Sequence, residues 1–182
     1  GNCTMTGLTG NGVDLLAQSG ATGNLTVDGC QFSDFILGGV NQGIGVRLQT
    51  TGAATNVSLQ LLNSRVNSTD FGLEDTSLSA SQALVLCVNN TITNTTFQGI
   101  SYIVGDPNTK VLTRLTNNTL VNNEAGSSIL VGSTTGSVVG VAASGNSAAT
   151  YEFINDINGS AIQVEDFGVA GASFLSRNAG AL

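Results

Sequence analysis

The chain has 182 residues, of which 41% are hydrophobic and 9% are charged, and its formal net charge is −7. This composition excludes a disordered chain, and five basic residues are too few to neutralise a phosphate backbone, so we expect no nucleic-acid partner. The apolar run 83–88 is far shorter than the ~18 residues that a membrane-spanning helix needs, so no membrane span is expected.

A repeated sequence unit, described in the next paragraphs, predicts a solenoid of stacked rungs. The two ends of the chain match only parts of this unit. Gly1 is not an initiator methionine, and no basic segment followed by an apolar one opens the chain, so we expect a processed or trimmed N-terminus. Residues 172–182 begin another unit without completing it. Open solenoid ends expose unpaired strand edges, so we expect a segment of a longer solenoid or one that stacks end to end.

A small or polar residue flanked by apolar positions recurs at spacings of 27, 34, 26, 28 and 26 residues. Apolar residues stand three positions before and two positions after most of these markers, which predicts apolar columns on both sides of a polar one. Asn146 follows the last marker by two and breaks the apolar pattern. The markers are Cys3, Cys30, Ser64, Asn90, Asn118 and Ser144.

A second recurring residue is a glycine, which we expect to precede the strand on the other side of each rung. Short apolar alternations follow it, as in 44–48 and 102–104, and a period of two residues predicts strands with one buried face. These glycines are Gly12, Gly43, Gly72, Gly99, Gly126 and Gly159.

The clearest repeat spans residues 84–137, where Asn89, Asn90 and Thr91 recur as Asn117, Asn118 and Thr119. A repeat of this length predicts stacked rungs. We therefore predict one all-β domain over 1–182, a parallel β-solenoid of about six rungs of 26–34 residues. The apolar-polar alternation, the Asn or Ser at the bend and the following Gly resemble the right-handed parallel β-helix of the pectate-lyase-like superfamily, and this resemblance implies the right-handed coil.

The chain contains no histidine, which excludes histidine-based triads and zinc sites. It also lacks the histidine motif and the adjacent aspartates of polygalacturonase-like β-helices. The best carboxylate run contains Asp70, Glu74 and Asp75, candidates for an acid/base pair or a Ca²⁺ site. For Glu74 we expect instead that it faces solvent and forms an ion pair with Arg47, its stacked neighbour. We expect no cofactor and no metal.

The marker column has a structural interpretation. Stacked amides of Asn90 and Asn118 can bond backbone groups and each other, so we expect a bend ladder in which Ser64 and Ser144 are small substitutes. Cys3 and Cys30 are one rung apart in this column, close enough for a disulfide. Cys87 lies in an apolar column and is expected to be a buried free thiol.

The leading functional hypothesis is a non-enzymatic, extracellular or cell-surface solenoid segment that serves as a stalk, adhesin module or filament subunit, as in bacterial surface and autotransporter passenger domains. Its expected partners are other copies or flanking rungs, a host surface or a glycan. The alternative is a β-helix that binds or cleaves polysaccharide with Asp70, Glu74 and Asp75. The absence of Trp and the small number of Tyr favour the first hypothesis.

Overall fold

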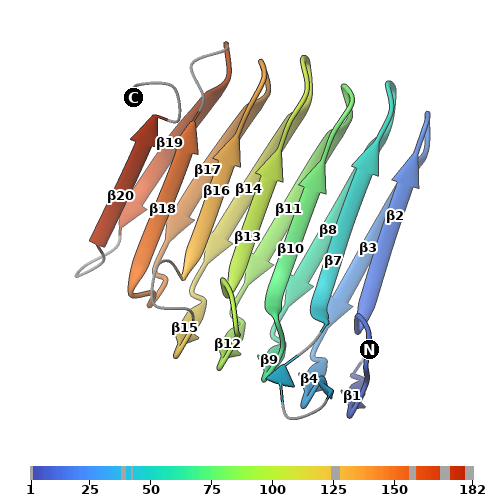
Figure 1. Cartoon of the computed structure of the whole chain (residues 1–182), viewed down its shortest axis with the longest axis vertical. Helices are drawn as coiled ribbons and strands as arrows, with labels where there is room; N and C mark the ends of the chain where they lie inside the picture. Colours follow the sequence, from blue (N-terminus) through green and yellow to red (C-terminus); the bar gives the residue numbers. More distant parts are fainter. Residues whose placement is uncertain are drawn as a thin grey trace.

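The computed structural model describes residues 2–37, 40–41, 43–123, 128–155, 159–168 and 173–178. These residues form strands, turns and bends but no helix. The chain forms three parallel sheets, and in each sheet the strands from successive rungs lie side by side (Figure 1). The predicted parallel β-solenoid of about six rungs is confirmed.

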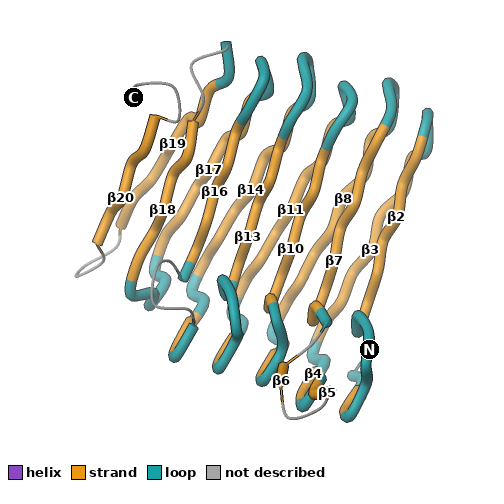
Figure 2. The backbone as a smooth tube through the Cα atoms, in the orientation of Figure 1, coloured by secondary structure: helices purple, strands orange, loops and turns teal. Residues whose placement is uncertain are grey.

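Each rung contains up to three strands, one in each sheet. A short sheet of three-residue strands lies at one edge, and two longer sheets, here called the β10 sheet and the β11 sheet, lie behind one another (Figure 2). The short sheet contains β1 (Thr4–Thr6), β4 (Gln31–Ser33), β9 (Arg65–Asn67), β12 (Thr91–Thr93) and β15 (Thr119–Val121). The β10 sheet contains β2 (Val13–Gln18), β7 (Ile44–Thr51), β10 (Phe71–Ser77), β13 (Ile100–Val104), β16 (Ile129–Ser133), β18 (Thr150–Asn155) and β20 (Ser173–Asn178). The β11 sheet contains β3 (Thr22–Asp28), β8 (Asn56–Leu62), β11 (Gln82–Val88), β14 (Lys110–Thr116), β17 (Val138–Ser144) and β19 (Ala161–Gly168). A separate antiparallel pair, β5 (Ile36–Leu37) and β6 (Val40–Asn41), branches from the second rung.

The core is a set of apolar columns, because the same inward position is apolar in successive strands. Alternate residues of a strand point to opposite faces, and in β11 the inward residues Ala83, Val85 and Cys87 are buried. The short sheet contributes the column Phe32, Val66, Ile92 and Leu120, as the sequence predicted. Each fully buried aliphatic side chain contributes about 1.5 to 3 kcal/mol to stability.

Left-handed backbone residues turn the chain into and out of the short sheet. The residues before Cys30, Ser64, Asn90, Asn118 and Asn146 have a positive φ, between 48° and 65°. Asparagine and glycine adopt this conformation most readily, which explains why an Asn precedes the marker in the Asn-Asn pairs. These bend residues are Gly29, Asn63, Asn89, Asn117 and Gly145.

The glycine column differs from the predicted one. Gly12, Gly45, Gly72 and Gly99 are stacked where each rung enters the β10 sheet. This column has no room for side chains. A Cβ on Gly72, for example, would lie 2.4 Å from the Ile92 side chain and 2.5 Å from the Gly99 carbonyl oxygen. The prediction of Gly43 for this column was wrong.

Two further glycines, Gly159 and Gly126, were also predicted for that column. Gly159 lies in the turn before β19, at the opposite end of the rung, so its assignment was also wrong. Gly126 lies outside the described residues.

Candidate functional site

The three candidate carboxylates lie close in sequence but do not converge. Glu74 and Asp75 are adjacent in β10, so the strand directs them to opposite faces. Asp70 precedes the strand, and its Oδ2 accepts a hydrogen bond of 3.2 Å from the backbone N–H of Gly43. Among the described residues, no group of three His, Cys, Asp or Glu side chains could hold a metal ion.

Asp75 lies in the core, with Leu48 and Tyr102 as its register neighbours. The Ser77 hydroxyl donates a hydrogen bond of 2.8 Å to Oδ1, and Oδ2 has no hydrogen-bond partner in the part of the chain that the structure describes. Burial raises the pKa of this carboxyl to about 7, although the Ser77 hydrogen bond opposes the shift. A proton on Asp75 therefore lowers the cost of burying it.

Glu74 lies on the outer face of the β10 sheet, beside Arg47 in the register. The Arg47 guanidinium instead binds Asp14 on the other side, with hydrogen bonds of 3.0 and 2.6 Å. The predicted ion pair between Glu74 and Arg47 was therefore wrong, because the preceding rung offers a better-placed carboxylate. Partial burial raises the pKa of Glu74, whereas the hydrogen bond from Arg47 lowers the pKa of Asp14.

The marker column forms a continuous ladder of hydrogen bonds. In each step, a side-chain oxygen accepts from the backbone N–H of the preceding rung: Asn90 from Ser64 at 2.8 Å, Asn118 from Asn90 at 3.0 Å and Asn146 from Asn118 at 2.9 Å. The amide nitrogens of these asparagines donate to the carbonyls of Leu61, Cys87 and Leu115. These buried amides satisfy backbone groups that the bends leave without a sheet partner.

The ladder uses Asn146 where the sequence pattern suggested Ser144. Ser144 ends β17 and pairs with Thr116, and each of these two residues lies two positions before the ladder residue of its rung. The prediction was wrong by two residues because β17 has small side chains on both faces, so its alternation marks the inward positions poorly. Asn146 also lies 28 residues after Asn118, the same interval that separates Asn118 from Asn90.

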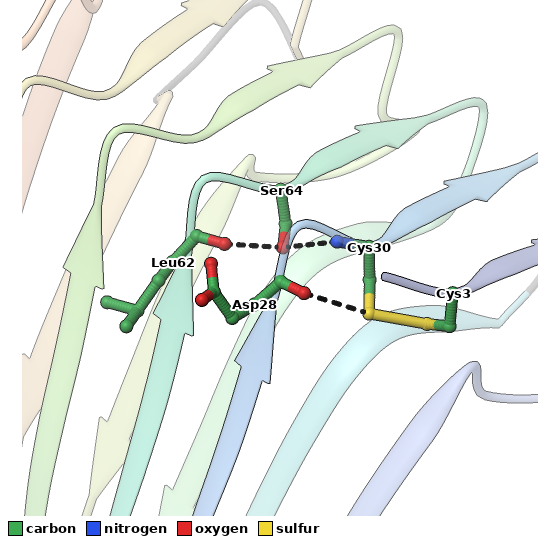
Figure 3. Close-up of a disulfide and its surroundings, with 5 residues drawn as sticks. All are labelled: Cys3, Asp28, Cys30, Leu62 and Ser64. Carbon is green, nitrogen blue, oxygen red and sulfur yellow. Dashed lines mark hydrogen bonds between the residues drawn. A yellow bond between two sulfur atoms is a disulfide. The ribbon is translucent and has the colours of Figure 1, made fainter. Parts of the chain in front are cut away.

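The ladder and a disulfide meet at the N-terminal end (Figure 3). Cys3 and Cys30 are joined, with Cα atoms 4.5 Å apart, one rung from each other. The backbone N–H of Cys30 donates a hydrogen bond of 3.1 Å to the Ser64 hydroxyl, which itself donates to the Leu62 carbonyl at 2.7 Å. The covalent link therefore continues the column that the amides form further along.

Cys87 is a free cysteine in the core. Burial raises the pKa of its thiol to about 12, against the effect of a hydrogen bond from the Asn90 amide. A thiol with so high a pKa is a poor nucleophile at neutral pH. It therefore acts as a small apolar side chain.

The outer face of the β11 sheet has a feature that the sequence reasoning missed. Leu84 and Leu112 are register neighbours that point outward and are 42% and 60% exposed. The signal in the sequence was the run 83–88, where both faces of the strand are apolar. Such a strand has either a second cover or an exposed apolar patch.

No protein-family model, no curated protein and no solved structure matches this chain. The described residues also contain no helix that is long and apolar enough to cross a membrane.

Proposed function

We propose that this chain is a structural β-solenoid module of an extracellular or cell-surface protein, a spacer that holds neighbouring parts of a larger assembly apart. The observation that supports this most is the ladder through Ser64, Asn90, Asn118 and Asn146, which ties successive rungs together along the axis. A buried amide column has this geometry whatever the outer surface carries. The ladder therefore fits a structural role that depends on the stacked rungs and not on the outer surface.

The disulfide supports the proposed extracellular or cell-surface location. Disulfides persist in oxidising environments such as the cell exterior and are rare in reducing ones. The Cys3–Cys30 link joins two rungs at the end of the column. A cell-surface spacer, stalk or filament subunit has both the environment and the need for such a link.

The proposal also assigns the chain to a superfamily of β-helices. The rung length and the bend asparagines support a right-handed coil like that of the pectate-lyase-like superfamily, with a structural role as in passenger domains. The partners of such a spacer are flanking rungs or other copies.

Pulling the chain between its two ends by single-molecule force spectroscopy tests the spacer role. We expect stepwise extension, each step releasing one rung of about 90 to 115 Å of chain, because about 3.4 Å of length is gained per residue. A disulfide-intact chain withholds the length between Cys3 and Cys30 until a reductant is added. Smooth extension at low force, with no steps, would contradict the proposal.

A further inference from the structure

The outer face of β14 alternates cations with an apolar residue. Lys110, Leu112 and Arg114 all point outward from this strand and are exposed. The chain has five basic residues and a net charge of −7, so two of its cations are placed on one strand beside the exposed leucines.

Two hollows flank Leu112. The first, of about 380 Å³, lies on the side of Arg114 and is lined also by Leu86 and Ala142. The second, of about 510 Å³, lies on the side of Lys110 and is lined also by Val138.

Glycine shapes the floor of the first hollow. Gly140 is the register neighbour of Leu112 in β17, and a Cβ there would lie 2.7 Å from Leu112 Cδ2. The Leu112 side chain therefore covers the backbone of Gly140, which has no side chain. The space beside it is open because Gly140 and Ala142 are small.

The order along β14 is cation, hollow, leucine, hollow, cation. Residues two apart in a strand are about 6.6 Å apart, so the two hollows have the spacing of side chains i and i+2 of an extended peptide. Arg114 lines the first hollow and Lys110 lines the second, so acidic side chains at i−2 and i+4 of the same peptide can reach these cations. The surrounding outward residues Asn56 and Gln82 carry no charge.

We propose that this face binds an extended peptide segment of another protein in which acidic, aliphatic, aliphatic and acidic residues alternate with spacer residues. The two aliphatic side chains fill the hollows on either side of Leu112. The acidic side chains pair with Lys110 and Arg114, and the guanidinium can bind a carboxylate through two hydrogen bonds. This recognition role goes beyond the spacer function and does not depend on it.

Charge complementarity favours this occupant over a second copy of the chain. Among the strands whose side chains the structure describes, the acids on the outward parity are Asp14 in β2, Asp28 in β3, Glu74 in β10 and Glu152 in β18, of which Glu152 is buried. None of these strands presents two acids on either side of two aliphatic residues.

Titration of the full chain with a capped peptide Glu-Thr-Leu-Thr-Leu-Thr-Glu, followed by NMR chemical shifts and fluorescence anisotropy, tests the proposal. We expect shifts confined to β11, β14 and β17. Leu112→Gln and Arg114→Gln should each weaken binding at least about tenfold, and Arg114→Gln should also reduce its salt dependence. Arg65→Gln, a matched loss of one exposed cation on the short sheet, should leave affinity unchanged.

Each other outcome overturns the proposal. These outcomes are no saturable shift with the peptide, equal binding of a peptide with lysine in place of glutamate, or an equal loss of affinity in Arg65→Gln. Self-association of the free chain that Leu112→Gln abolishes would identify a second copy as the occupant instead. Thermal unfolding checks that the variants are folded, which we expect because Leu112 is 60% exposed.

Discussion

The two asparagines of each Asn-Asn pair have different roles at the same bend. Asn117 is exposed and adopts a left-handed backbone conformation with φ of 53°, whereas Asn118 is buried and bonds both adjacent rungs. The first role depends on backbone freedom and the second on a side-chain amide. Substitutions at these adjacent positions should therefore have very different effects.

We predict that Asn118→Ala lowers the free energy of unfolding by about 3 kcal/mol or more, because it leaves several buried backbone and amide groups without partners. Asn117→Gly is the matched control. Glycine keeps the left-handed conformation, so its effect should stay within about 0.5 kcal/mol. Urea unfolding followed by circular dichroism measures both, and equal effects would contradict the ladder's role.

Asp75 makes stability depend on pH. An aspartate titrates near 3.8 when unperturbed and Asp75 titrates at about 7 in the folded chain. Between these values the folded state holds a proton that the unfolded state has lost. The free energy of unfolding therefore falls as the pH rises through this window and levels off above about pH 7.

We predict that the wild type is more stable at about pH 5 than at about pH 8 by roughly 2 kcal/mol, and that Asp75→Asn removes most of this difference. Glu74, whose pKa is also raised, remains in the variant and accounts for any residual slope. Unfolding by urea at both pH values measures the effect. An unchanged pH dependence in Asp75→Asn would show that another group is responsible.

At the scale of the strands, the glycine column fixes how closely each rung enters the β10 sheet. Gly72→Ala places a Cβ against Ile92 and a backbone oxygen of the next rung. We predict a loss of about 2 to 3 kcal/mol. Gly23→Ala in β3 is the matched control, because nothing lies within 4 Å of its Cβ, and it should be neutral or slightly stabilising. Thermal unfolding distinguishes these outcomes.

The sequence was sufficient to predict the elements wherever the inward and outward residues differ clearly. The short-sheet column from Met5 to Leu120 and the pairing of Cys3 with Cys30 in one column rest on such contrasts. The register at Ser144 and Asn146 was missed because the neighbouring side chains are all small. Gly43 was confused with Gly45 because both are glycines two residues apart, and they differ only in the structure, where Gly43 has a φ of 81° and Gly45 packs against Val66.

The candidate site was less predictable than the fold. Spacing placed Asp70, Glu74 and Asp75 close together but not on one face, and the choice of Asp14 as the partner of Arg47 depends on side-chain geometry. The outer face around Leu112 was missed because apolar residues were assigned to the core without asking which face they occupy. The unbroken apolar run 83–88 was the signal for an apolar outer face, because alternate residues of a strand point to opposite faces.

At the scale of the whole molecule, the disulfide joins two rungs across 27 residues. We predict one free thiol, Cys87, in the unfolded and unreduced chain, and three after reduction. Cys3→Ser should lower the free energy of unfolding by about 3 kcal/mol, as expected for a loop of this length. A thiol titration that gives three free groups without reductant would contradict the disulfide.

The central claim is that each rung is an equivalent unit of a spacer. Deleting residues 91–118 removes one complete rung, since Thr91 and Thr119 are register neighbours, and joins Asn90 directly to Thr119. In force spectroscopy we predict that this shortened chain resists force as the wild type does and loses one extension step of about 90 to 100 Å. Loss of all stepwise resistance, or an unchanged number of steps, would contradict the claim.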